Sequence, residues 1–195
     1  MLGVVFSSSL AGFAFALLPA RGRGALFGLL LATLAVPSSI TLIPSFLLFS
    51  KLGWLDSYLP LIVPRWCAEA FYVFLFRQFF RSLPRDLFDS AEIDGCTSWG
   101  LYRRIGLPLA APALATTAVF SFLSAWNDYQ GPLIYLNDRA LFTVPLGLAT
   151  FQNERYTQLQ YMMPMALLAL LPVLLVFLVA QRFIVEGLRV GGPRL

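Results

Sequence analysis

Five long apolar stretches, divided by short polar segments, constrain most strongly how this chain folds. A helix needs about 20 consecutive, mostly apolar residues to cross a bilayer. Of the 195 residues, 58% are hydrophobic and only 12% are charged, a composition that is rare among soluble domains. We therefore predict an all-α integral membrane protein with about five transmembrane helices, forming a single domain over residues 1–195. The predicted spans are Leu2–Leu18, Ala25–Phe49, Leu59–Phe76, Leu109–Tyr135 and Met162–Ile184.

Prolines interrupt several of these predicted spans. Pro37 and Pro44 fall within the second span, and Pro60 and Pro64 fall within the third. A proline in a membrane helix removes one backbone hydrogen bond, and neighbouring helices, polar side chains or water must satisfy the freed carbonyl. We therefore expect kinked rather than straight helices.

The polar segment Ser82–Pro108 separates the third and fourth spans and must lie in water at one face of the bilayer. Ser82 is a suitable N-cap for a short helix, and Pro84 suits a first turn, where a missing N–H costs little. The carboxylates of Asp86 and Asp89 also favour this helix, because they lie in its N-terminal part, near the positive end of the helix dipole.

The first short helix is predicted to bury a narrow apolar stripe made of Leu83, Leu87 and Ala91, which recur at helical spacing. Gly95 is expected to end it in a left-handed C-cap conformation. Small side chains beside this stripe would let another protein approach closely. A solvated amphipathic loop without any partner is the alternative interpretation.

A second short helix is expected after the glycine, with Thr97 or Ser98 as its N-cap. Pro108 limits its continuation, because the residue before a proline is pushed out of helical geometry. The predicted product is a helix, a glycine bend and a second helix.

The basic residues assign this polar segment to the cytoplasm. Cytoplasmic loops of membrane proteins carry an excess of Lys and Arg. With the segment placed inside, ten of the 14 basic residues face the cytoplasm, which also makes nucleic acid a poor explanation of the net charge of +4. The ten are Arg21, Arg23, Arg77, Arg81, Arg85, Arg103, Arg104, Arg182, Arg189 and Arg194.

Several kinds of chemistry are not expected on this chain. It has no histidine, the commonest metal ligand and general base, and its two cysteines, Cys67 and Cys96, fall in different environments. It also has no GxxxxGK[ST] phosphate-binding loop. A membrane-embedded enzyme would need a catalytic constellation that the sequence does not contain. We expect no metal, no catalytic residue and no cofactor on this chain.

Five polar or aromatic residues in or near the spans are candidates for the path of a transported solute. Ionisable residues at membrane depth usually face a protein interior or a water-filled cavity. Arg65 and Glu69 are four residues apart and can pair on one helix face, although the alternative is an interfacial pair that holds neighbouring helices. Asn127 and Asp128 can bind hydroxyl groups beside Trp126, although the alternative, a capped helix end with a headgroup-belt aromatic, is slightly favoured.

The segment D-S-A-E-I-D-G, followed by I-G-L-P, resembles the E-A-A loop of ABC-transporter permease subunits, whose pattern is E-A-A-x-x-x-G, nine residues, then I-x-L-P. Asp89 replaces the usual Glu and Ser90 replaces the first Ala. The stretches L-F-R-Q-F-F-R-S-L-P-R-D-L, A-W-N-D-Y-x-x-P-L-I and F-T-V-P-L-G-L look like the carbohydrate branch, related to the maltose-type permeases. The matching loop positions are Asp89, Ser90, Ala91, Gly95, Ile105, Leu107 and Pro108.

This resemblance implies a permease subunit of a sugar or oligosaccharide importer in the bacterial inner membrane. Its expected partners are a second permease subunit, an ABC ATPase dimer that binds ATP, an extracytoplasmic sugar-binding protein and the lipid bilayer. The loop would be the coupling helix that fits a groove of the ATPase. It would move as a rigid unit and pass this movement to the fourth span. The ATPase-coupling residues would be Asp89, Ser90, Ala91, Asp94, Gly95 and Pro108.

Two alternatives remain open from the sequence. Members of this branch usually have six spans, so we expect that the first span is missing, through a truncated gene model or a natural five-span form. A non-functional remnant is then conceivable. The second alternative is an ABC permease for a polyamine or an amino acid, which would share the same loop.

Overall fold

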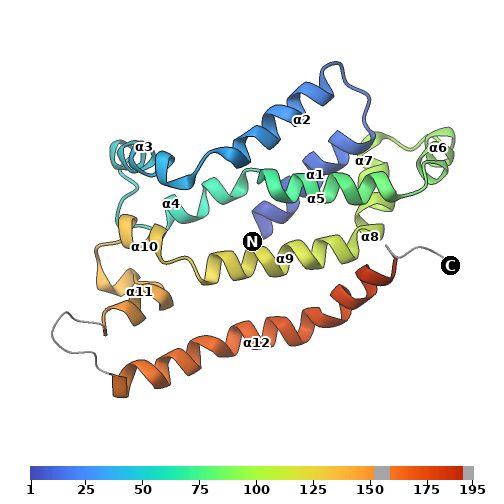
Figure 1. The fold of residues 1–195 in the computed structure, drawn as a ribbon. Coiled ribbons are helices and arrows are strands. Elements are labelled where there is room, and N and C mark those ends of the chain that lie inside the picture. Colours follow the sequence, from blue (N-terminus) through green and yellow to red (C-terminus); the bar gives the residue numbers. More distant parts are fainter. Residues whose placement is uncertain (152–158, 191–195) are drawn as a thin grey trace. The chain divides into compact units, whose positions relative to one another are not determined.

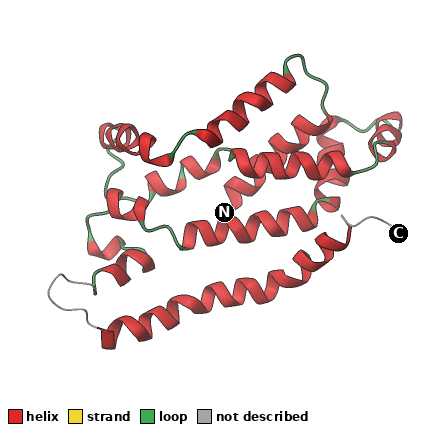
Figure 2. Ribbon diagram, viewed as in Figure 1, coloured by secondary structure: helices red, strands yellow, loops and turns green. Residues whose placement is uncertain are grey.

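In a computed structural model, every regular element of the described residues, 1–151 and 159–190, is helical (Figures 1 and 2). For residues 182–190 the description covers the backbone. Arg194, one of the ten arginines predicted to face the cytoplasm, lies outside the described residues, as do the side chains of Arg182 and Arg189. The described chain divides into two compact units.

The first unit comprises residues 1–37, 65–118 and, within the described part, 182–190. The second comprises residues 38–64 and 119–181 apart from the gap at 152–158. The helices and single turns are α1 (Leu2–Leu17), α2 (Arg23–Ala32), η1 (Thr33–Ala35), α3 (Ser38–Lys51), α4 (Leu59–Ile62), η2 (Pro64–Trp66), α5 (Ala70–Ser82), α6 (Asp86–Ile93), α7 (Ser98–Leu101), η3 (Tyr102–Gly106), α8 (Leu107–Leu109), α9 (Ala111–Trp126), α10 (Gln130–Tyr135), η4 (Arg139–Leu141), α11 (Val144–Ala149) and α12 (Leu159–Val190).

The predicted all-α membrane architecture is confirmed, with differences at the ends and breaks of the spans. Two helical runs, Leu59–Ser82 and Leu159–Gln181, are long and apolar enough to cross a membrane, and two broken helix pairs raise this number to as many as four among the described residues. α1 is a shorter apolar helix. The fourth predicted span ends at Trp126, earlier than expected, because the chain leaves helical geometry before α10 begins.

In the first unit, α1 packs on α5 through small residues, and this is the most extensive helix–helix contact among the described elements. A Cβ atom placed on Gly12 would lie 2.5 Å from Cβ of Phe76 and 3.0 Å from the backbone nitrogen of Arg77. A Cβ on Gly3 would lie 2.7 Å from the Trp66 ring. In lipid, where apolar burial does not drive association, such close backbone approach supplies the packing energy between helices.

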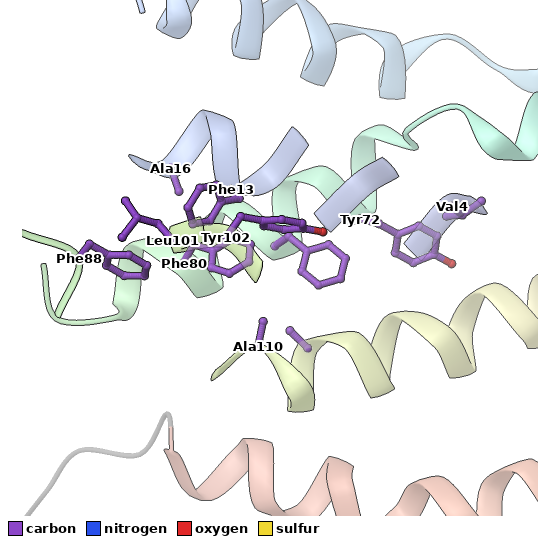
Figure 3. Close-up of a cluster of buried hydrophobic side chains, with 11 residues drawn as sticks. Val4, Phe13, Ala16, Tyr72, Phe80, Phe88, Leu101, Tyr102 and Ala110 are labelled. Carbon is purple, nitrogen blue, oxygen red and sulfur yellow. The ribbon is translucent and has the colours of Figure 1, made fainter. Parts of the chain in front are cut away.

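A cluster of aromatic side chains forms the core of this unit (Figure 3). The Phe13 ring of α1 lies edge-on to Phe80 of α5, with the ring centroids 5.3 Å apart. Phe76 and Phe80 are fully buried. Edge-to-face pairs of this kind contribute about 0.5–1.5 kcal/mol each beyond the area they bury.

Two arginine side chains donate hydrogen bonds to carbonyl groups at the C-terminal end of α1. Arg77 donates a hydrogen bond from Nε to the carbonyl of Phe15, 3.2 Å away, and its guanidinium lies 4.0 Å from the centroid of the Phe27 ring. Arg23 donates to the carbonyl of Leu18 at 2.8 Å, at the end of α1. Cationic groups near a helix C-terminus stabilise the unpaired carbonyls there.

In the second unit, Asp56 organises the turn between α3 and α4. Its backbone is left-handed, with φ 59°, and its Oδ1 accepts hydrogen bonds of 2.8 Å from the backbone N–H groups of Asn137 and Asp138. These bonds, first that from Asp138 and then that from Asn137, hold the pKa of the Asp56 carboxyl below its ordinary value. Beside this turn, Phe49 stacks on Trp54 at 5.6 Å.

We predict that Gly12→Ala destabilises the protein by roughly 1–3 kcal/mol, because the added methyl group overpacks the contact with Phe76 and the α5 backbone. Gly28→Ala in α2 is the matched control, since a Cβ there meets no atom within 4 Å. The control should leave stability unchanged or raise it slightly through helix propensity. Thermal unfolding in detergent measures both, and equal effects would contradict the packing argument.

We predict that the Asp56 turn loosens at acidic pH. Because the folded-state pKa is lowered, the stabilisation is complete above the ordinary carboxyl pKa of about 4 and is lost as the pH falls through the folded value. Hydrogen exchange at the amides of Asn137 and Asp138 should therefore accelerate in acid beyond the intrinsic pH effect. Asp56→Asn, which tolerates the left-handed backbone, should abolish this extra pH dependence.

Candidate functional site

The polar segment folds as predicted around Gly95. α6 ends in a Schellman motif, in which the N–H of Cys96 bonds to the carbonyl of Ala91 and the N–H of Gly95 bonds to that of Glu92, both at 2.9 Å. Gly95 has φ 83°, in the left-handed region. The prediction of a glycine C-cap is therefore confirmed, and the chain reverses sharply after α6.

The second helix begins where the sequence indicated. Thr97 is the N-cap of α7, and its Oγ1 accepts a hydrogen bond from the N–H of Gly100 at 3.2 Å. α7 continues directly into η3, a π-helical turn in which the N–H of Leu107 bonds to the carbonyl of Tyr102. The prediction that Pro108 pushes the preceding residue out of helical geometry is wrong: Leu107 is helical (φ −61°, ψ −47°), and the helical run continues through Pro108 to Leu109, because the missing N–H of Pro108 falls at the wider π-helical turn. We call residues 86–109 the coupling segment.

Two predictions about the start of the coupling segment are wrong. Ser82 does not cap α6, because it is the last residue of α5 and its hydroxyl donates to the carbonyl of Phe79 at 2.7 Å. Pro84 is not in a first turn, because α6 begins at Asp86 with Arg85 as its N-cap. α5 runs further than expected, since Phe80 is buried in the core and extends its apolar face.

The buried face of α6 also differs from the prediction. Phe88, with 4% of its surface exposed, is the residue that α6 inserts into the core, and Leu87 is 47% exposed. Leu83 and Ala91 are partly buried against the same core. The stripe is therefore rotated toward Phe88, because the large ring reaches Phe13, 6.1 Å away between ring centroids.

The opposite face of α6 presents an apolar tip surrounded by polar groups. Ile93 is 88% exposed. Ser90 and Asp94 are exposed on the same side, and Asp89 is exposed at its edge. Ile93 is thus the most exposed apolar side chain that α6 presents to its surroundings, on a helix whose other face is packed on the core through Phe88.

Two cavities flank the coupling segment in the first unit. One, of about 360 Å³, lies between the end of α1 and α6, and its charged lining residues are Arg23, Arg85, Asp89 and Glu92. The other, of about 380 Å³, adjoins the glycine bend and is lined by Trp99, Arg103 and Arg104 among others. The segment thus exposes both carboxylates and guanidinium groups to its surroundings.

Arg65 and Glu69 belong to the first unit but not to one continuous helix. Arg65 lies in η2, whereas Glu69 has an extended backbone (φ −94°, ψ 130°) and is the N-cap of α5. The N–H of Glu69 donates to the hydroxyl of Ser8 on α1 at 3.1 Å. The expected i, i+4 helical spacing is wrong, because the chain breaks between Trp66 and Ala70.

Trp126, Asn127 and Asp128 belong to the second unit, where each engages the backbone. The indole N–H of Trp126 donates to the carbonyl of Ala169 at 3.1 Å, and Asn127 Nδ2 donates to the carbonyl of Leu123 at 2.9 Å. Asp128 Oδ1 accepts from the N–H of Gly131 at 3.1 Å, at the start of α10. The bonds of Asn127 and Asp128 support the helix-end interpretation, whereas the bond of Trp126 joins the end of α9 to α12 and is not that of a headgroup-belt aromatic.

A cavity of about 290 Å³ nevertheless adjoins two of these residues. Trp126 and Asn127 line it together with apolar side chains of α11 and α12. The Trp126 ring also stacks on Phe122, with the centroids 5.7 Å apart. A contact of these residues with a transported solute stays a prediction.

The sequence analysis missed the residues that hold the coupling segment on the core. These are Ser9 and Phe13 of α1, Phe88 of α6 and Tyr102 of η3. The available signal was the small-residue spacing Ser8, Gly12 and Ala16, which indicates a packed face of α1, and the presence of large aromatics in an otherwise polar segment.

Among the described residues, no group of three or more His, Cys, Asp or Glu side chains could hold a metal ion. Cys67 is exposed and Cys96 is half-buried, and both are free thiols.

Comparison with known proteins agrees with the family resemblance of the sequence. Residues 3–190 match the family described as "Binding-protein-dependent transport system inner membrane component". Over 194 residues, the chain is 36% identical to the arabinooligosaccharides transport system permease protein AraQ of Halalkalibacterium halodurans, covering 100% of this chain and 69% of that protein. The AraQ protein of Bacillus subtilis is 37% identical over 190 residues, covering 97% of this chain and 67% of the relative.

Among solved structures, the chain is similar to a bacterial ABC transporter involved in the import of the acidic polysaccharide alginate. The TM-score is 0.75 at 25% sequence identity, covering 92% of this chain and 68% of that one. The chain thus spans about two thirds of the length of these similar proteins.

We predict that Gly95→Ala loosens the bend of the coupling segment, because a side chain in the left-handed region costs about 1–2 kcal/mol. Gly95→Asn should be milder, since Asn tolerates this conformation. Hydrogen exchange of the Gly95 and Cys96 amides measures the opening. Gly100→Ala is the matched control, because its Cβ meets Thr97 Oγ1 at an ordinary 3.5 Å, and equal acceleration in this control would contradict the conformational argument.

Proposed function

Because the chain belongs to the family of binding-protein-dependent transport system inner membrane components, we propose that it is a transmembrane permease subunit of an ATP-driven ABC importer for a sugar or oligosaccharide. The permease would be embedded in the bacterial inner membrane and form half of the translocation path. The relatives named for arabinooligosaccharides and the alginate transporter support a carbohydrate substrate rather than a polyamine or amino acid.

The observation that carries this proposal is the surface of the coupling segment. α6 is anchored from behind by Phe88 and exposes Ile93 at its tip, with Ser90 and Asp94 beside it. We propose that this surface enters a groove of a separate ATPase, where Ile93 is buried and Asp89 and Asp94 meet donors of the partner. Gly95 and Pro108 shape the segment, and Ala91 packs behind it.

ATP binding and hydrolysis are proposed to reside on that ATPase, because this chain contains no phosphate-binding loop sequence. The remaining proposed partners are a second permease subunit, which would complete the path, and an extracytoplasmic sugar-binding protein, which would deliver the substrate. This chain would supply membrane passage and mechanical coupling.

The proposed path residues are Arg65 and Glu69 in the first unit and Trp126, Asn127 and Asp128 in the second. The break between η2 and α5 supports a role for the first pair, since non-helical backbone at membrane depth is tolerated only inside protein or beside a water-filled cavity. In the second unit, Trp126 and Asn127 line a cavity, which supports contact with a sugar ring.

The docking role is tested by Ile93→Arg in the full chain. We expect this variant to insert normally and to recover at least about tenfold less ATPase from detergent-solubilised membranes, because an uncompensated charge in the groove costs roughly 2 kcal/mol or more. Recovered protein is identified by mass spectrometry, and uptake of arabinotriose into proteoliposomes with the recovered complex and ATP is then measured.

Leu52→Arg is the matched control, because it places the same charge at an exposed leucine in the turn after α3, outside the coupling segment. It should recover the ATPase as the unaltered chain does. Equal recovery with Ile93→Arg and the unaltered chain would refute docking through this surface. Absence of any ATPase from the unaltered chain would contradict the proposed function itself.

A further inference from the structure

The chain connection from the coupling segment to α9 is not a continuous α-helix. η3 is π-helical, and Pro108 lacks the N–H that would extend the ladder. Ala110 then leaves helical geometry, with φ −82° and ψ 9°, before α9 begins. The helix axis bends by 77° between Ser98–Leu109 and Ala111–Trp126, while the N–H of Ala110 still bonds to the carbonyl of Gly106 and the N–H of Leu114 to that of Ala110. The chain connection into the fourth span is therefore sharply bent, although its hydrogen bonds continue.

The same segment is packed tightly against α1. The Phe13 ring lies 5.3 Å from the ring of Tyr102 and 6.1 Å from that of Phe88, measured between centroids (Figure 3). A Cβ on Gly106 would lie 3.1 Å from Cε2 of Phe13, so the glycine lets η3 lie directly on the ring. Phe13 also contacts Phe80 of α5. One side chain thus joins α6, η3 and α5.

A buried hydrogen bond accompanies this aromatic contact. The hydroxyl of Tyr102 and Oγ of Ser9 lie 2.7 Å apart, and the two residues are 1% and 0% exposed. Ser9 Oγ also donates to the carbonyl of Phe6 at 2.9 Å, so the two hydroxyl groups and this carbonyl form one buried hydrogen-bonded group. A hydrogen bond away from water has a defined direction and length, and it resists sliding of one element along another more than ring contact does.

We propose that Tyr102 is a positioning residue that passes movement of the coupling segment sideways to α1 and α5, through its hydrogen bond to Ser9 and its contact with Phe13. This inference rests on the proposed function, because it assumes that a partner ATPase moves the segment. The bond keeps the segment in register with α1, so that displacement of α6 displaces α1 rather than deforming η3. ATP hydrolysis without this bond would move the segment with less effect on the transport path.

Tyr102→Phe tests the proposal with little structural change. It removes only the hydroxyl, and it leaves Ser9 Oγ bonded to the Phe6 carbonyl, so no buried polar group is left unpaired. In proteoliposomes containing the complex recovered with this chain, we expect arabinotriose imported per ATP hydrolysed to fall about five-fold, the factor that corresponds to one net hydrogen bond. Recovery of the ATPase should not change.

The matched control is Tyr58→Phe, which removes a hydroxyl that donates to the carbonyl of Leu141 at 3.0 Å, in the second unit and outside the coupling segment. It should keep the import ratio of the unaltered chain. Ser9→Ala and the double variant Ser9→Ala/Tyr102→Phe complete the test. If the bond transmits movement, all three variants that lack it share the same lowered ratio. If the bond serves stability alone, only Ser9→Ala lowers the ratio, because it alone leaves the Tyr102 hydroxyl unpaired, and both Tyr102→Phe and the double variant keep the ratio of the unaltered chain.

An import ratio for Tyr102→Phe equal to that of the unaltered chain overturns the inference, and so does a parallel loss of ATPase recovery. A failure of the proposed function would look different: the complex with the unaltered chain would then hydrolyse no ATP or import no sugar. The difference between variants is interpreted only where the unaltered complex imports arabinotriose, which separates the two outcomes.

Discussion

The close contact of α1 with α5, which the Phe13 ring closes beside the coupling segment, is the interaction on which the described first unit depends. Gly12 allows the two backbones to approach, and Phe13 then reaches Phe80 across the interface. Lipid is as apolar as these side chains, so the contact is stabilised by close packing rather than by exclusion of water. A side chain at Gly12 would separate the helices and withdraw Phe13 from its partners.

The coupling segment packs on α1 and α5 through buried side chains. Phe88 and Tyr102 enter the same cluster from two different parts of the segment. Their burial leaves the other face of α6 exposed and rigid, with Ile93 as its tip. In the proposed complex, this packing would let the ATPase move α1 and α5 together with α6. These lateral contacts join the segment to α1 and α5 in addition to the bent chain connection at Ala110.

Local rules predicted local structure well and long-range packing poorly. Gly95 and Thr97 were identified correctly, because a left-handed bend and an N-cap depend on a few neighbouring residues. Ser82 and the orientation of Leu87 were predicted wrongly, because α5 is extended by burial of Phe80 and α6 is rotated by burial of Phe88. Neither core position can be recognised without knowing what lies opposite.

The amino-acid sequence by itself determined the helical membrane class, the position of the coupling segment and the residues of its bend, since hydropathy, charge and turn chemistry are properties of contiguous residues. Only the tertiary structure decided that the segment binds to α1 through Ser9, Phe13 and Tyr102. Ser9 and Tyr102 are 93 positions apart, and their hydrogen bond exists because the glycine contact brings α1 beside α5. No periodicity within either segment encodes that meeting, because it depends on shape complementarity between distant helices.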